Sequence, residues 1–445
     1  MQLPLRTLVL YAAPGLGFGF MTLLVSTYFM KHATDVLAIP AATMGAILLL
    51  SRGWDAVADP VAGYLSDRTQ TRFGRRRPWL VAGALPLALA FALTWSPPAW
   101  LSPGALVWWT GGAVLLLFTS LTLCRMPHEA LGAELSSDYH ERNRVFGVKR
   151  AVFGVGTLAV FGALFLLGEA KDPRATAFGL AVGAGAVTAA LLLFTAVALR
   201  EPAAHLGRGA AHPFRAARDV LANPHARRLL AVGFLQQVAT GTVTTAAAYH
   251  TQYVLGDAGA FPVLLGCFFL ASLLSIPLWL RIGQRVDKKP LLVASMVGVG
   301  LVLGSMFLVG PGDHVLLFSL AAVGGCLAGG LDVVMPSLQA DVIDWDEHRT
   351  GERKEGVYVA AWHLAEKLAL GVAAAVTGLA LTASSFVPNA EQDAPALLAM
   401  RLLLSLFPLA CYTAGAVLFV RFGLDRAAHA RVQHEIKARG CVAAA

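Results

Sequence analysis

Charged residues are scarce in this chain: Asp, Glu, Lys and Arg together make up 14% of its 445 residues. A soluble protein carries about a quarter of such residues. Hydrophobic residues account for 57%, and the mean hydropathy is +0.64. The composition therefore excludes a soluble globular protein, and it predicts an all-α polytopic membrane protein.

Cysteine is also rare, and the five cysteines are far apart at positions 124, 267, 326, 411 and 441. No metal-binding or redox spacing is present, so they are expected to be packing residues, and no cofactor is expected. The formal charge of +8 would suit a nucleic-acid partner. However, most Lys and Arg residues fall in alternate loops between apolar runs, a pattern typical of the positive-inside rule. The lipid bilayer is the expected partner, and nucleic acid is not.

Apolar runs separated by charged segments predict twelve membrane spans. They cover residues 8–30, 40–65, 79–96, 104–125, 148–168, 175–199, 229–253, 261–281, 290–310, 314–338, 357–384 and 397–422. The first run is too long for the apolar core of a cleavable signal peptide and is expected to be a span. Loops after even-numbered spans are basic, which predicts a plasma-membrane protein with both termini cytoplasmic.

The two halves of the chain share loop motifs. Gly63–Arg68 follows the second span and Gly283–Lys288 follows the eighth, while Ala133-Glu134 and Ala340-Asp341 follow the fourth and tenth. This repeat predicts two six-helix halves related by a pseudo-two-fold axis, with a path between them. The expected domains are 1–199 (first half), 200–228 (cytoplasmic linker), 229–422 (second half) and 423–445 (cytoplasmic tail).

The second span contains charges where lipid would surround it. Arg52, Asp55 and Asp59 are spaced i, i+3 and i+7, so they share one helical face. Charges at that depth are costly unless they face a partner or a water-filled cavity. Two carboxylates one turn apart can bind Na⁺ or hold a proton, and a purely structural ion-pair network is the alternative.

The string from Arg52 to Trp79 (RGWDAVADPVAGYLSDRTQTRFGRRRPW) resembles the glycoside–pentoside–hexuronide:cation symporters of the major facilitator superfamily. Residues 127–142 and 341–367 are similar to their counterparts in that family. The resemblance implies a major facilitator fold with twelve helices and secondary symport of a small polar solute with Na⁺ or H⁺. Expected solutes are sugar derivatives such as glycosides or hexuronides, or other carboxylate-bearing compounds.

The resemblance also implies roles for individual residues. Asp55 and Asp59 correspond to the coupling-cation site, Lys367 to a lysine beside it, and Arg150 to a basic residue lining the substrate cavity. In melibiose permease of that family, an Asp in the first span binds sugar and an Asp in the fourth span is shared between sugar and cation; Gly19 and Arg125 stand at these positions here. Arg125 suits an anionic substrate group, or it neutralises a carboxylate, or it extends to the membrane interface.

Further candidates come from residue chemistry. Asp332 follows a glycine pair that would allow bending or close helix approach. Trp54 and Trp362 suit stacking on a solute, with packing as the alternative. All three residues are predicted substrate ligands. His128 beside Glu129 suits proton coupling, although a lone His near a helix end is more often simply hydrogen-bonded. The predicted gating residues, which would lock the cytoplasmic helix ends, are Gly63, Asp67, Arg68, Arg75, Asp287, Glu134 and Asp341.

Three other functions compete with symport of a polar solute. A lysolipid carrier of the same fold is the first. An intramembrane enzyme is the second, but the sequence lacks a nucleophile or metal constellation. A transport-inactive receptor is the third, and the charged residues at 55, 59 and 367 argue against it. We expect no catalytic site, no metal beyond a possible Na⁺ at Asp55 and Asp59, and a monomer.

Overall fold

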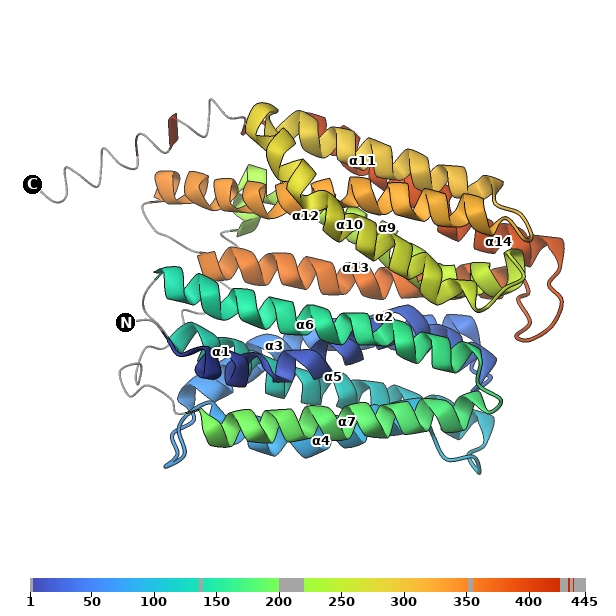
Figure 1. Cartoon of the computed structure of the whole chain (residues 1–445), viewed down its shortest axis with the longest axis horizontal. Helices are drawn as coiled ribbons and strands as arrows, with labels where there is room; N and C mark the ends of the chain where they lie inside the picture. Colours follow the sequence, from blue (N-terminus) through green and yellow to red (C-terminus); the bar gives the residue numbers. More distant parts are fainter. Residues whose placement is uncertain are drawn as a thin grey trace, which may run out of the picture. The chain divides into compact units, whose positions relative to one another are not determined.

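The computed structural model describes residues 3–135, 139–199, 220–350 and 355–424, together with 431, 432 and 435. This part of the chain is built of helices joined by short connections (Figure 1). The longer helices are α2 (Pro14–Asp35), α3 (Ala41–Arg68), α4 (Arg77–Trp95), α5 (Pro103–Glu134), α6 (Tyr139–Gly168), α7 (Pro173–Ala198), α9 (Pro224–Tyr249), α10 (Ala260–Arg285), α11 (Lys288–Ser305), α12 (His314–Thr350), α13 (Glu355–Ala383) and α15 (Leu406–Val420). Shorter elements are α1 (Leu5–Ala12), α14 (Ala394–Leu404), the π-helical turn η2 (His250–Val254) and the 3₁₀ turn η3 (Met306–Leu308).

The helices form two compact units. Unit 1 spans residues 1–210 with 374–383 and 387–390, and unit 2 spans 211–373 with 384–386 and 391–445. The same helix pairings occur in both. In unit 1, α3 packs on α5, and α4 packs on α5 and α7; in unit 2, α10 packs on α12, and α11 packs on α12 and α15. These pairs join spans 2 and 4, 3 and 4, and 3 and 6 of each half, as expected for an internal repeat.

Eleven helical stretches in the described part of the chain are long and apolar enough to cross a membrane. The helix α3 falls outside this set although its 28 residues suffice for a span, since Arg52, Asp55 and Asp59 lower its hydropathy. The chain is therefore a multi-pass membrane protein, and α3 is the span whose charges require an explanation.

The first span is not one continuous helix, because it breaks between α1 and α2 at Ala13. Pro14 has no N–H and cannot donate to the Leu10 carbonyl one turn earlier. The Thr195 hydroxyl donates to that carbonyl instead, at 2.7 Å. The break is thus stabilised from α7 and leaves no unsatisfied backbone oxygen at Leu10.

Several helices extend beyond the predicted spans. The helix α5 continues to Glu134 rather than ending at 125, and α12 continues to Thr350 rather than 338. The helix α9 begins at Pro224 rather than 229, because the Asn223 side chain accepts hydrogen bonds from the N–H groups of His225 and Ala226. Apolar content marks the lipid-crossing part of a helix, whereas these ends lie in polar sequence.

The glycine pair of α12 allows close helix approach. A Cβ atom at Gly329 would lie 2.1 Å from the Ser275 hydroxyl of α10, and one at Gly330 would lie 2.4 Å from the Ser295 hydroxyl of α11. Bending and close helix approach were both expected for this glycine pair, and the geometry supports close helix approach.

Candidate cation and solute site

The α3 carboxylates differ in their surroundings. Asp55 is buried, with 2% of its surface exposed, and Asp59 is partly exposed. The guanidinium of Arg52 lies 3.8 Å from the Asp55 carboxylate, donates to the Ser26 hydroxyl at 3.4 Å, and stacks 4.3 Å from the ring centroid of Phe118. Arg52 is therefore held from α2 and α5 while it offers a positive charge to Asp55.

Thr122 of α5 connects the two carboxylates. Its hydroxyl oxygen lies 2.8 Å from an Asp59 oxygen and 3.4 Å from an Asp55 oxygen. A hydroxyl has one proton and can donate to only one of them at a time. When both carboxylates are ionised, three oxygens converge with one proton between them, an arrangement that a cation or a second proton would stabilise.

Sequence reasoning missed Thr122, because threonine in a membrane helix commonly bonds its own backbone. Thr119, one turn earlier, does so: its hydroxyl donates to the Leu115 carbonyl at 2.7 Å and accepts from the Trp54 indole at 2.9 Å. The available signal was polarity, since Thr122 is one of few polar residues in the apolar part of α5. Trp54, a predicted solute ligand, is exposed, and its indole N–H donates to Thr119.

A basic cluster forms between α5 and α6. The Glu129 carboxylate accepts from Arg125 at 3.2 Å and from Lys149 at 3.1 Å. Arg150 is exposed, and its guanidinium lies 5.7 Å from the Phe153 ring centroid. With three cations and one carboxylate, these four side chains have a formal charge of +2. Lys149 and Glu129 were not predicted as solute ligands.

Arg125 does not lie at the end of its helix, since α5 continues to Glu134. At roughly 1.5 Å per residue, about 13 Å of helix separates it from that end. Its side chain bonds Glu129, one turn nearer to that end, at 3.2 Å, so extension toward the interface stays an alternative.

Gly19 cannot carry a side chain in this packing. A Cβ atom there would lie 2.2 Å from the Phe153 carbonyl oxygen, at the crossing of α2 and α6. The missing carboxylate at this position therefore has a structural cause, which is the close approach of two helices.

His128 belongs to the packing of the first span. It is fully buried, one ring nitrogen lies 2.7 Å from the Tyr11 carbonyl, and the two rings stack with centroids 4.6 Å apart. These contacts favour the interpretation of a hydrogen-bonded core histidine over proton coupling.

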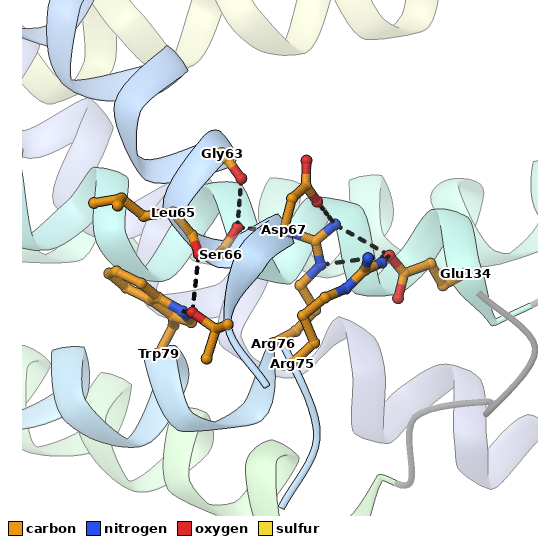
Figure 2. Close-up of polar contacts among 9 residues, drawn as sticks. Gly63, Leu65, Ser66, Asp67, Arg75, Arg76, Trp79 and Glu134 are labelled. Atoms are coloured by element: carbon orange, nitrogen blue, oxygen red, sulfur yellow. Dashed lines mark hydrogen bonds and ion pairs between the residues drawn. The ribbon is translucent and has the colours of Figure 1, made fainter. Parts of the chain in front are cut away.

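Four of the predicted gating residues of unit 1, namely Gly63, Asp67, Arg75 and Glu134, lie together (Figure 2). The Glu134 carboxylate accepts from Arg75 at 2.5 Å and from Arg76 at 3.1 Å, and Arg76 also bonds Asp67. Ser66 accepts from Arg76 at 2.6 Å and donates to the Gly63 carbonyl at 2.9 Å. The ends of α3, α4 and α5 are thus joined through buried guanidinium groups.

Arg68, which was also a predicted gating residue, lies outside this network. Its guanidinium stacks 4.3 Å from the Tyr64 ring centroid. In unit 2 the corresponding loop is arranged differently. The Lys288 ammonium group donates to the two Asp341 carboxylate oxygens at 2.8 and 2.7 Å. The Asp287 side chain accepts from the backbone N–H of Lys288 at 2.9 Å and caps α11.

The remaining candidates belong to unit 2. Asp332 is exposed and accepts from the Ser272 hydroxyl at 3.1 Å. Trp362 lies 5.8 Å from Tyr358, measured between ring centroids. Lys367 is on α13 within unit 2, whereas Asp55 and Asp59 are in unit 1. The approach of Lys367 to those carboxylates therefore stays a prediction.

Comparison with known proteins gives relatives along the whole chain. The uncharacterized symporter sll1374 of Synechocystis sp. is 26% identical, with 98% of this chain and 97% of the relative covered. The glucuronide carrier protein homolog of Escherichia coli is 25% identical (92% and 90% covered). The sodium-dependent lysophosphatidylcholine symporter 1-B of Danio rerio is 24% identical (93% and 86% covered).

The fold is that of solved transporters. The crystal structure of a D-xylose–proton symporter matches with a TM-score of 0.68 at 16% identity, covering 94% of this chain and 98% of the other. The family described as MFS/sugar transport protein matches residues 10–426. The chain has the major facilitator fold and belongs to this family of transporters, not to a family of enzymes.

Proposed function

We propose that this protein is a cation-coupled symporter in which Asp55, Asp59 and Thr122 bind the coupling ion. The observation that carries the proposal is the convergence of their oxygens, with Thr122 within 2.8 and 3.4 Å of the two carboxylates. Together with Arg52, the two carboxylates carry a formal charge of −1, so one Na⁺ or one H⁺ neutralises the group. Lys367 is the proposed neighbour from the other unit.

The solute site that we propose in unit 1 is the basic cluster of Arg125, Lys149 and Arg150 around Glu129. Its formal charge of +2 favours a solute with an anionic group, because guanidinium and ammonium groups bind carboxylate or phosphate strongly. A hexuronide provides such a carboxylate. Asp332, Trp54 and Trp362 remain proposed solute contacts.

A lysolipid is the second candidate solute. Its phosphate group would suit the same basic cluster, and one relative is named as a sodium-dependent lysophosphatidylcholine symporter. The two candidates differ in what the rest of the site must accommodate, which is a polar ring in one case and an acyl chain in the other.

Gating would use the cytoplasmic helix ends. Breaking the Arg75–Glu134 network in one state and reforming it in the other would shift the alternating-access equilibrium, and the Lys288–Asp341 pair would have the matching role in unit 2. We further propose a bacterial inner-membrane location, cytoplasmic termini and a monomeric transporter.

The test measures whether solute and ion bind cooperatively. Thermal stability of the purified protein is measured with methyl β-D-glucoside, methyl β-D-glucuronide and lysophosphatidylcholine, each with and without Na⁺ and at two pH values. A solute and its coupling ion should stabilise the protein more together than the sum of their separate effects. Absence of this synergy for every probe would contradict coupled symport of these solute classes.

Variants then test the solute site. Arg125→Gln and Lys149→Gln should weaken binding of the anionic probes by about tenfold or more, corresponding to loss of one charge-assisted bond. Arg144→Gln is the matched control, because Arg144 lies on α6 outside the cluster and pairs with Glu141. Equal effects on glucoside and glucuronide would argue against an anion-specific role.

A further inference from the structure

The part of α13 that belongs to unit 2, residues 355–373, carries titratable side chains in the middle of a membrane span. His363 and Glu366 have side chains that are 60% and 47% exposed. Glu366 lies eleven residues after Glu355, the first residue of α13, which at 1.5 Å per residue is about 16 Å along the helix. Since the hydrocarbon core is about 30 Å thick, Glu366 is at membrane depth.

The exposed face of α13 is unlike a lipid-facing one. The apolar stretch of α10 in the same unit, residues 260–280, provides the comparison, because its exposed side chains are all apolar: Val263, Leu270, Leu273, Leu274, Pro277, Leu278 and Leu280. On α13, the exposed residues include His363 and Glu366, three residues apart and therefore on one side of the helix. An exposed carboxylate at membrane depth requires water rather than lipid. This face of α13 therefore borders a hydrated path.

The carboxylate of Glu366 is held in a fixed orientation. The Gln237 amide of α9 donates to one oxygen at 2.7 Å, and the imidazole Nδ1 of His363 lies 3.5 Å from the other. Gln237 is on a polar stripe of α9 with Thr240 and Thr244, spaced i, i+3 and i+7. The Thr240 hydroxyl in turn lies 3.0 Å from the Tyr412 hydroxyl. Polar groups from α9 and α13 thus support an accessible, oriented acceptor.

We propose that Glu366, oriented by Gln237 and His363, is a solute-binding site in unit 2 that accepts hydrogen bonds from adjacent hydroxyl groups of a sugar-like solute. A carboxylate has two oxygens that accept two parallel bonds, which matches a vicinal pair of hydroxyl donors. The inference rests on the proposed symport function and adds the recognition of hydroxyl groups to it. Glu366 makes the bonds, and Gln237 is a positioning residue.

The test uses the purified full-length protein and the stabilising methyl glycoside or methyl glucuronide, together with its deoxy analogues that lack one hydroxyl each. Glu366→Gln should weaken binding of the full probe by ten- to a hundredfold, and it should change the affinity for one deoxy analogue by less than threefold. Glu366→Asp keeps the charge and should retain discrimination between the full and deoxy probes. Gln237→Leu should lower affinity for the full probe by a smaller factor without changing Na⁺ affinity.

Glu391→Gln is the control, because Glu391 is an exposed carboxylate of the same unit outside the helices. Unchanged affinity of Glu366→Gln for full and deoxy probes alike would overturn the proposal while leaving symport intact. The proposal would also be overturned if Glu366→Gln weakened binding of an ammonium-bearing probe, such as choline, and left binding of the sugar probes unchanged. If the unmodified protein binds no sugar probe in the presence of any cation, the proposed solute class itself fails, and that outcome is visible before any variant is made.

Discussion

Replacing Thr122 by valine removes a hydroxyl that contacts both α3 carboxylates and leaves a side chain of similar size. The hydroxyl lies 2.8 Å from Asp59 and 3.4 Å from Asp55, so as a Na⁺ ligand it would be one of the converging oxygens. A hydrogen bond to a charged group contributes about 1.5–3 kcal/mol, and every 1.4 kcal/mol is a tenfold change in affinity. We therefore expect Na⁺ affinity to fall by roughly 10- to 100-fold in Thr122→Val.

Isothermal titration of Na⁺ into the purified protein measures this directly. Thr122→Ser keeps the hydroxyl and should bind within about threefold of the unmodified protein, a difference of less than 1 kcal/mol. Thr119→Val is the matched control on the same helix, because its hydroxyl contacts Leu115 and Trp54 rather than the carboxylates. Equal Na⁺ affinities in Thr122→Val and Thr119→Val would refute the placement of Thr122 in the ion site.

Two further predictions concern stability. Gly156→Ala should lower the melting temperature, because its Cβ would lie 1.9 Å from the Leu16 carbonyl oxygen and would force α2 and α6 apart. Gly162→Ala on the same helix is the control, because a Cβ there would have open space and should leave the melting temperature unchanged. Equal melting curves for the two variants would contradict this packing. Glu134→Gln should destabilise the protein by about 3 kcal/mol, since it removes the carboxylate that buried Arg76 faces; a thermal-shift change no larger than that of a surface substitution would contradict this.

The helical spans and the α3 carboxylates were predictable, because lipid imposes a length and a hydropathy on each span and makes buried charge conspicuous. The break at Ala13 was harder to predict, since Pro14 alone does not reveal that Thr195 compensates the freed carbonyl. The extension of α5 to Glu134 was missed because its last turns lie in polar sequence, where apolar periodicity carries no signal.

The partners of the charged residues could not be predicted from spacing. Thr122 and Lys149 lie on different helices from the residues that they contact, and only tertiary packing brings them there. The contact of Gln237 with Glu366 likewise joins α9 to α13 across 129 residues of sequence. One-dimensional patterns identify which residues are anomalous in a membrane span, and the packed helices determine what satisfies them.

The proposed role of Asp55 and Asp59 is to couple ion movement to solute movement. Uptake into proteoliposomes under an inward Na⁺ or proton gradient, compared with exchange of solute in the absence of a gradient, tests it directly in Asp55→Asn and Asp59→Asn. Both variants should lose gradient-driven accumulation, while exchange of solute should be lost less completely. Gradient-driven accumulation that is unchanged in both variants would show that these carboxylates do not couple ion and solute.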